Sequence, residues 1–391
     1  MDYTRLRFID KADVYKGNAL AGHLRRTETG SVVFRYLPEY SGQAVASTLP
    51  VQENEFFTDS GALPPFFSGL LPEGHRLSVI RNVTKTSLDD ELTLLLVIGG
   101  DTLGDVRVVP HGSTPREVSP AVDLGATRLD FGQIANVVDG IGLPGVQTKA
   151  SASMVNRPVS LSGMPSILKI DPPEHPHLVI NESLHLTHAA ELGIPISEHS
   201  VIVDSYNRTG LLVRRFDRKV NALGEMQRLA LEDGAQVLGL WPAKKYSVDS
   251  EIVVNALSAK TSAPMIAKRN LYLQFIFAWL TGNSDLHAKN VSIVQDDSGK
   301  WQVTPVYDIP CTAVYGDMTM ALPISGRTKN LRVRHWDEFA NSIGLPLRAA
   351  HTANERALVV AQKIDLATLP FKGSPLTGAE RELRRRRAEF R

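Results

Sequence analysis

Apolar positions in the first 110 residues change from short alternating runs to clustered ones. Residues 5–50 contain the runs LRFI and SVVFRYL, separated by turn formers such as Lys16-Gly17-Asn18. Short apolar runs bounded by turn residues predict an antiparallel β region. Residues 87–100 (SLDDELTLLLVIGG) predict a helix with an N-capping Ser, acidic residues in the first turn and a closing Gly pair. Residues 106–110 (VRVVP) then predict a strand.

A polar stretch at 111–128 predicts a linker between a first domain, 1–110, and a second, 129–218. The second begins with a helix-like segment that runs into a glycine-rich loop. The strand-like pieces PVSL and SILKI follow, then an amphipathic helix (NESLHLTHAAELG) and two more strands around SVIVD and GLLVRRFD. This order predicts a small sheet with one helix.

Helical spacing dominates the remaining segment, 219–391. The stretches with this spacing are 229–240, 250–260, 265–282, 335–344, 354–364 and 379–390, and a strand pair, NVSIVQ with WQVTPVYD, is inserted among them. The whole pattern predicts an α+β, two-lobed fold, with a β-rich N-terminal lobe and a mostly α-helical C-terminal lobe. Ligands commonly bind in the cleft between such lobes.

Composition excludes several classes of protein. With 43% apolar and 22% charged residues in 391, the chain is neither disordered nor collagen-like. A formal charge of +1 excludes a uniformly basic nucleic-acid binder. The charge is uneven, because residues 381–391 (RELRRRRAEFR) contain six Arg and two Glu. The Arg run at 384–387 is either a solvated helix end or a contact for an acidic partner or DNA phosphates.

Cysteine content and hydropathy indicate a cytoplasmic protein without a membrane span. The single cysteine, Cys311, cannot form an internal disulfide, and the N-terminus lacks an apolar segment of signal-peptide length. The longest apolar stretches, 92–100 and 271–280, are well short of the roughly 20 residues that cross a bilayer.

The most informative stretch is GNSDLHAKN, 282–290, directly after an apolar helix. Asp285 and Asn290 have the five-residue spacing of the catalytic aspartate and metal-binding asparagine of protein kinases, and Asp308 follows in PVYD. One carboxylate can accept the proton of an acceptor hydroxyl, while a second carboxylate and an amide oxygen hold Mg²⁺. The alternative is that these residues only form a turn. His287 and Lys289 alternate with them, which favours a ligand-facing loop.

Two further segments predict phosphate contacts. Gly140 to Lys149 (GIGLPGVQTK) matches G-x-G-x-x-G, but the order of elements around it excludes a Rossmann site and Val146 excludes a Walker A loop. A backbone-amide cradle and a plain flexible loop remain as alternatives. Lys169 lies in the strand SILKI, thirteen residues before Glu182 in a helix, as in the kinase pair that holds the α/β-phosphates. The alternative places Lys169 on a solvated face.

Residues 211–218 (LLVRRFDR) end a strand between the two proposed lobes. Their backbone can meet an adenine edge, and Asp217 is available either for the ribose or for a structural pair with an Arg.

These pieces together resemble the HipA family of bacterial toxin serine/threonine kinases. The resemblance covers nearly the whole chain and rests on FFSGLLPEG, GVQTK, ILK, NE…AAELGIP, VRRFDR, GNSDLHAKN and PVYD in the family's order. It implies that Asp285 is the catalytic base, that Asn290 and Asp308 are Mg²⁺ ligands, and that Arg215 and Phe216 form the hinge. It implies nucleotide contacts from a larger set: Pro144, Gly145, Val146, Gln147, Thr148, Lys149, Lys169, Arg214, Arg215, Phe216, His287, Ala288, Lys289, Asn290, Tyr307 and Asp308.

The family also implies partners and a mode of regulation. HipA kinases are neutralised by a small helix-turn-helix antitoxin, HipB, sit with it on operator DNA, and phosphorylate translation proteins such as aminoacyl-tRNA synthetases. Many are switched off by autophosphorylation of a serine ahead of the G-x-Q-x-K core, where this chain has Gly140, Ile141 and Gly142. Inactivation by that route is therefore not expected unless Thr148, Ser151 or Ser153 substitutes.

The leading hypothesis is an ATP- and Mg²⁺-dependent serine/threonine protein kinase. A kinase-fold binding module that holds ATP and an antitoxin without phosphotransfer is the alternative, and a small-molecule kinase is a third possibility.

Overall fold

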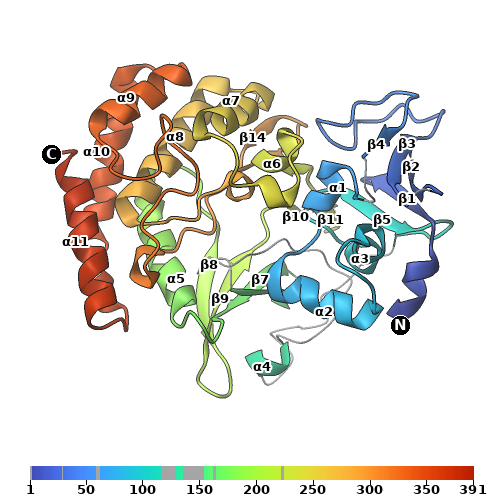
Figure 1. Cartoon of the computed structure of the whole chain (residues 1–391), viewed down its shortest axis with the longest axis horizontal. Helices are drawn as coiled ribbons and strands as arrows, with labels where there is room; N and C mark the ends of the chain where they lie inside the picture. Colours follow the sequence, from blue (N-terminus) through green and yellow to red (C-terminus); the bar gives the residue numbers. More distant parts are fainter. Residues whose placement is uncertain are drawn as a thin grey trace.

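The computed structural model describes residues 2–28, 30–58, 62–115, 129–134, 154–161, 164–221 and 224–391. Figure 1 shows the N-terminal sheet and the C-terminal helices at opposite ends of the long axis. Most of the predicted linker and the whole glycine-rich loop, 140–149, lie outside the described residues. Among the described helices, none combines the length and the apolar character needed to cross a membrane.

The first part of the chain forms a five-stranded antiparallel sheet in the order β4-β3-β2-β1-β5. Its elements are a 3-10 helix (Tyr3–Phe8), β1 (Lys11–Lys16), β2 (Ala19–Arg26), β3 (Val32–Tyr36), β4 (Phe56–Phe57), α1 (Pro65–Gly69), α2 (Gly74–Thr84), α3 (Glu91–Ile98) and β5 (Val106–Pro110). The antiparallel strands and the strand at 106–110 are confirmed. Helix α3 begins later than predicted, because Asp90, not Ser87, caps it by accepting from the Thr93 amide.

The second part is an antiparallel four-stranded sheet, order β6-β7-β9-β8, with one long helix against it. Its elements are α4 (Phe131–Ile134), β6 (Val155–Leu161), β7 (Met164–Ile170), α5 (Leu178–Ala189), a 3-10 turn (Ala190–Leu192), β8 (His199–Val203) and β9 (Thr209–Arg214). Strand β7 lies between β6 and β9, and Lys169 on β7 is opposite Leu211 on β9. The predicted small sheet with one helix is confirmed.

The third part is mainly helical. Its elements are β10 (Arg218–Val220), β11 (Met226–Arg228), β12 (Leu231–Asp233), α6 (Gly234–Val237), α7 (Ser250–Lys260), α8 (Pro264–Thr281), β13 (Ser292–Gln295), β14 (Trp301–Val303), α9 (Val333–Ser342), α10 (Leu347–Lys363) and α11 (Ser374–Ala388), with short 3-10 turns at Pro242–Lys244, Ala288–Asn290, Ala313–Tyr315 and Leu366–Thr368. The helix predicted over 229–240 is wrong at its start. Residues 231–233 pair with β13, and Asp233 then caps the single-turn helix α6.

Helix α8 is the centre of this part. From Leu271 to Thr281 every residue is buried, so this mainly apolar stretch of the helix is surrounded by protein. Helices α7, α10 and α11 pack on it. Cys311 is buried in the same core, and burial raises the pKa of its thiol to about 11, as expected of an inert structural cysteine.

The Arg-rich end of the chain is not the separate solvated tail that its composition suggests. It forms α11, which contacts α8. Arg386 is 2% exposed, its guanidinium lies 3.8 Å from the centroid of the Trp279 ring, and it donates to the Trp279 carbonyl at 3.0 Å. Arg387 donates to the Leu280 carbonyl, also at 3.0 Å. These arginines satisfy carbonyls in the last turn of α8, where cations are favoured by the helix dipole.

Arg386→Ala is expected to lower the free energy of unfolding by about 2–4 kcal/mol, because the cation–π contact and the carbonyl bonds are lost together. Arg384 is an exposed neighbour in the same run, and Arg384→Ala is expected to change stability by no more than about 0.5 kcal/mol. Urea unfolding of both variants tests this, and equal effects would contradict it.

His185 on α5 makes stability depend on pH. It is fully buried, its Nδ1 donates to the Asn181 carbonyl at 2.8 Å, and burial lowers its pKa to about 4. Since the unfolded pKa is about 6.5, the unfolded state binds the proton first as pH falls. Stability is therefore present above pH 6.5 and is lost between 6.5 and 4, by about 1.4 kcal/mol per pH unit. Urea unfolding at pH 7 and 5 should show a steeper loss in wild type than in His185→Gln, and parallel losses would contradict the assignment.

Candidate functional site

A cleft lies where the three parts of the chain meet, and its walls come from α1 and nearby segments of the N-terminal part, from the four-stranded sheet and from the helical part. Its lining contains residues from the N-terminal part, from β7 and β9 and from the loop after α8: Gly69, Leu70, Glu73, Leu103, Asn156, Ile167, Lys169, Val213, Arg214, Arg215, Phe216, Asp217, Leu231, Asp233, Gln236, Lys245, Asp285, His287, Lys289, Asn290, Ser292, Tyr307 and Asp308. Every predicted site residue within the described ranges lines it except Ala288.

Lys169, Glu182 and Asp308 form a buried charge cluster at one side of the cleft. The Lys169 ammonium donates to both carboxylate oxygens of Glu182, at 2.7 and 2.8 Å, and to Asp308 Oδ1 at 3.1 Å. Burial by itself lowers the pKa of Lys169, but Asp308 and Glu182 outweigh burial and hold this pKa above its ordinary value. Lys169 is 7% exposed, so the alternative of a solvated face is excluded.

The loop 282–290 turns sharply out of α8. Gly282 ends the helix at φ +76°, and a Cβ there would meet the Ala313 side chain at 2.9 Å, so both conformation and space require glycine. The Asp285 amide donates to Asn283 Oδ1 at 2.9 Å, and Asn290 Nδ2 donates to the Asp285 carbonyl, also at 2.9 Å. Both asparagines therefore stabilise the turn, while the Asp285 side chain lines the cleft.

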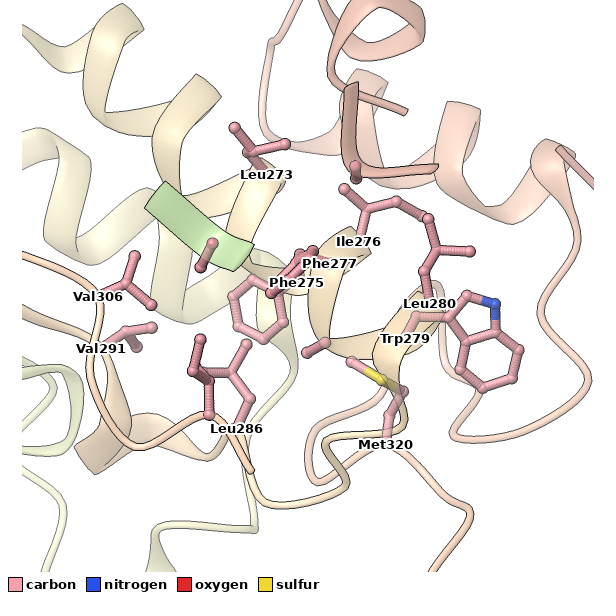
Figure 2. Close-up of a cluster of buried hydrophobic side chains, with 14 of the residues drawn as sticks. Leu273, Phe275, Ile276, Phe277, Trp279, Leu280, Leu286, Val291, Val306 and Met320 are labelled. Carbon is pink, nitrogen blue, oxygen red and sulfur yellow. The ribbon is translucent and has the colours of Figure 1, made fainter. Parts of the chain in front are cut away.

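The same loop is fixed to the core by its apolar residues. Leu286 and Ala288 within the loop, and Val291 and Val306 after it, are nearly fully buried in the cluster around α8. Figure 2 shows Leu286 next to the Phe275 ring, with Val291 and Val306 on the same side of the helix. The polar residues of the loop are thus held by the alternation of apolar ones between them.

Tyr246 contacts Asp285 and was missed by sequence reasoning. Its hydroxyl donates to Asp285 Oδ1 at 2.8 Å, and burial together with the Asp285 charge raises the pKa of Tyr246 strongly. The phenol therefore stays protonated and remains a donor. Tyr246 precedes a helix in a short aperiodic segment, KKYS, so no sequence pattern marked it.

Lys289 and His287 point into the cleft beside Asp285. Lys289 donates to the Gly69 carbonyl at 3.1 Å and forms an ion pair with Glu73 at 3.2 Å. The His287 ring meets the Tyr246 ring edge-on at 4.9 Å. Glu73 was not predicted, although it lies in the FFSGLLPEG motif that sequence analysis singled out.

The predicted hinge residues, Arg215 and Phe216, follow the end of β9, whose last residue is Arg214. Phe216 lines the cleft and its ring lies 5.6 Å from that of Tyr307. Arg214 pairs with Glu198 at 2.8 Å. Arg215 is buried and binds Asp217 through Nε and Nη2, at 3.0 and 2.8 Å. Of the two roles left open for Asp217, the structure therefore shows the structural pair.

Two other predicted residues, Tyr307 and Ala288, support the loop around the cleft. Tyr307 shares a 2.6 Å hydrogen bond with Ser292 and donates to the Lys289 carbonyl at 3.0 Å. Ala288 is buried and contributes backbone, its amide donating to the Lys245 carbonyl at 3.2 Å. The predicted phosphate loop, Pro144 to Lys149, falls outside the described residues.

Asp101 connects the N-terminal part to the wall of the cleft. Its carboxylate pairs with Arg215 at 2.9 Å, with Arg218 at 2.6 Å and with Arg228. Burial raises the pKa of Asp101, but the three guanidinium groups reverse this and hold the pKa well below its ordinary range. The cluster is therefore ionised, and it fixes the orientation of the N-terminal sheet relative to β9 and β10.

Comparisons with known proteins agree with this architecture. Residues 141–364 match the model of the HipA-like C-terminal domain, and residues 12–109 match that of the HipA N-terminal domain. The chain has the two-lobed, kinase-like fold, since it superposes on the HipA chain of the Shewanella oneidensis HipA, HipB and operator DNA complex with a TM-score of 0.74. That match covers 97% of this chain and 96% of the other at 22% identity. The chain belongs to the HipA family.

Curated relatives extend over most of its length. The serine/threonine-protein kinase toxin HipA of Shewanella oneidensis is 25% identical over 374 residues, which cover 85% of this chain and 83% of the toxin. The protein Y4mE of Sinorhizobium fredii is 27% identical over 391 residues, with 90% and 91% covered. The predicted family and the α+β, kinase-like fold class are confirmed.

Lys169→Met is expected to destabilise the protein by about 3–5 kcal/mol, because it leaves the Glu182 carboxylate buried without its cation. The double variant Lys169→Met/Glu182→Gln removes that charge and should recover part of the loss. Urea unfolding measures both. A single variant that is as stable as the double one would contradict this account.

Proposed function

We propose that this protein is a kinase that transfers the terminal phosphoryl group of ATP to serine or threonine hydroxyls of a protein. The observation that carries the proposal is the single cleft in which Asp285, Asn290, Asp308 and the Lys169–Glu182 pair meet. Phosphoryl transfer depends mainly on positioning and on charge stabilisation, and this set contains groups for both. A small-molecule kinase, the third possibility considered above, would differ from this proposal only in the acceptor of the phosphoryl group.

In this proposal Asp285 orients the acceptor hydroxyl and takes its proton. Its backbone is held by Asn283 and Asn290, and its Oδ1 accepts from Tyr246, so the carboxylate has little freedom to rotate. A fixed carboxylate in a buried loop meets the geometric demand on a general base. Tyr246 then acts as a positioning residue.

Asn290 and Asp308 fit Mg²⁺ as a bound cofactor. Asn290 uses its amide nitrogen on the Asp285 carbonyl, which leaves its side-chain oxygen for a cation. Asp308 gives Oδ1 to Lys169 and keeps a second carboxylate oxygen. An amide oxygen and a carboxylate are the hard ligands that Mg²⁺ prefers, and the ion would neutralise phosphate charge there.

The nucleotide contacts proposed for this chain follow from the same cleft. Lys169, fixed by Glu182, would bind the α/β-phosphates, and His287 and Lys289 would flank the phosphates. The backbone of 214–216 would meet the adenine, with Phe216 and Tyr307 beside it. Pro144 to Lys149 would cover the phosphates as the glycine-rich loop.

We further propose that the protein is the toxin of a toxin–antitoxin pair. A curated relative is named a serine/threonine-protein kinase toxin, and the structural neighbour is a complex with HipB and operator DNA. The partners proposed here are a HipB-like helix-turn-helix antitoxin, operator DNA reached mainly through that antitoxin, and a translation protein such as an aminoacyl-tRNA synthetase as substrate.

Asp285→Asn is expected to lower phosphotransfer about 10²- to 10⁴-fold, since the amide cannot accept the proton but keeps the bond from Tyr246. Transfer of labelled phosphate from ATP to proteins of a bacterial lysate measures the effect. Asp337→Asn, at a surface pair with His351, is the matched control and should retain full activity.

Three outcomes separate the hypotheses. Labelling by Asp285→Asn at the wild-type rate would show that the proposed base is wrong. Nucleotide binding by wild type with no transfer to any protein would favour the binding module. Transfer only to small acceptors would favour the small-molecule kinase.

A further inference from the structure

Glu73 brings a charge from the N-terminal part of the chain into the candidate kinase site. It precedes helix α2 as its N-cap residue, within the segment Leu70–Gly74, and it lines the cleft together with Gly69 and Leu70. Asp233 of the helical part lines the same cleft, and Glu73 is the acidic lining residue that comes from the N-terminal part. Glu73 and Gly69 are therefore two points at which the N-terminal part reaches the catalytic loop.

The Glu73 carboxylate holds two lysines at once. Lys245 Nζ lies 2.6 Å from Oε2, and Lys289 Nζ lies 3.2 Å from Oε1. The side chain of Glu73 is 11% exposed, that of Lys245 is 3% exposed and that of Lys289 is 5% exposed. Burial raises the pKa of Glu73, but Lys289 and Lys245 outweigh it and lower this pKa below its ordinary value. The carboxylate is ionised, and the trio carries one net positive charge.

Lys289 is the part of this trio that belongs to the catalytic loop. It lies between Asp285 and Asn290 in the sequence, and two of its ammonium contacts, to Glu73 and to the Gly69 carbonyl, come from the N-terminal part. The backbone joins the two lysines as well, since the Ala288 amide donates to the Lys245 carbonyl at 3.2 Å. Without Glu73, the two buried ammonium groups would lose the carboxylate that they share.

We propose that Glu73 is a positioning residue of the kinase site: it holds Lys245 and Lys289 as a paired cation for the phosphates, and so makes phosphotransfer depend on the docked N-terminal part. The inference rests on the proposed kinase function. The segment that carries Glu73 is held in place by several contacts with the rest of the chain. Gln236 donates to the Phe66 carbonyl in α1 at 3.1 Å, and Trp241 donates to the Leu63 carbonyl just before α1 at 3.2 Å. The Asp101 cluster adds a further link.

Glu73→Gln keeps the shape of the side chain and removes its charge. We expect opposite effects on the affinity for nucleotide and on the rate of phosphotransfer. The cleft becomes more positive, so the magnesium complex of a non-hydrolysable ATP analogue should bind with a Kd at least about threefold lower. The two lysines repel and leave their places, so kcat for labelled-phosphate transfer at saturating ATP should fall at least about tenfold. A merely structural lesion would weaken binding and rate together.

Glu232→Gln is the matched control. Glu232 also joins the N-terminal part to the rest, accepting from the Ser47 amide at 2.8 Å and hydroxyl at 2.7 Å, but it does not line the cleft. Its variant should leave both constants within about twofold of wild type.

The outcomes are distinct. Wild type that transfers phosphate, together with a Glu73→Gln variant that loses less than about tenfold in kcat or fails to bind the analogue more tightly, overturns the proposal. Wild type without any transfer removes the kinase function itself. If Glu73→Gln does not fold, Lys245→Met decides: it leaves Glu73 with Lys289 alone, and the Kd for the analogue must rise at least about threefold. An unchanged Kd overturns the proposal.

Discussion

The interaction on which the site depends is the buried cluster of carboxylates and guanidiniums around Asp101. Asp101 and Asp217 share Arg215 and Arg218, all four side chains are at most 6% exposed, and Asp217 also accepts from the Gly104 amide at 2.9 Å. Moving any one of these groups is energetically costly, because its partners would then be buried charges without a counterion. Its contribution is the fixed angle between the N-terminal sheet and β9, more than net stability.

This constraint explains why one cleft can be built from such distant segments. Lys169 on β7, Asp285 after α8 and Glu73 before α2 are each held by a different part of the chain. Apolar packing around α8 fixes the catalytic loop, and the ion pairs across the N-terminal interface fix Glu73 relative to it. Figure 1 shows the three parts meeting near the middle of the molecule, where these segments converge.

The sequence predicted the features that local spacing encodes. The strands of both sheets, the central helix α8 and the loop at 282–290 follow from apolar periodicity and from turn residues within a few positions. The predictions that were wrong involve competition with distant segments. Residues 231–233 pair with β13 instead of forming a helix. The Arg386 side chain is not solvated but packs on the ring of Trp279, about a hundred positions earlier in the chain. Tyr246, Lys245 and Glu73 were missed for the same reason, since only tertiary contacts bring them to the cleft.

The arginines of α11 have a consequence for the order in which the chain folds during synthesis. Helix α8 is made more than a hundred residues before the side chains that satisfy the Trp279 and Leu280 carbonyls. The sheets can fold first, as N-terminal segments generally do on the ribosome. The catalytic loop begins at the end of α8. The carbonyls of Trp279 and Leu280 there lack these arginine hydrogen bonds until residues 386 and 387 have left the exit tunnel. A nascent chain of this family member therefore completes the support of its catalytic loop only after α11 has been made.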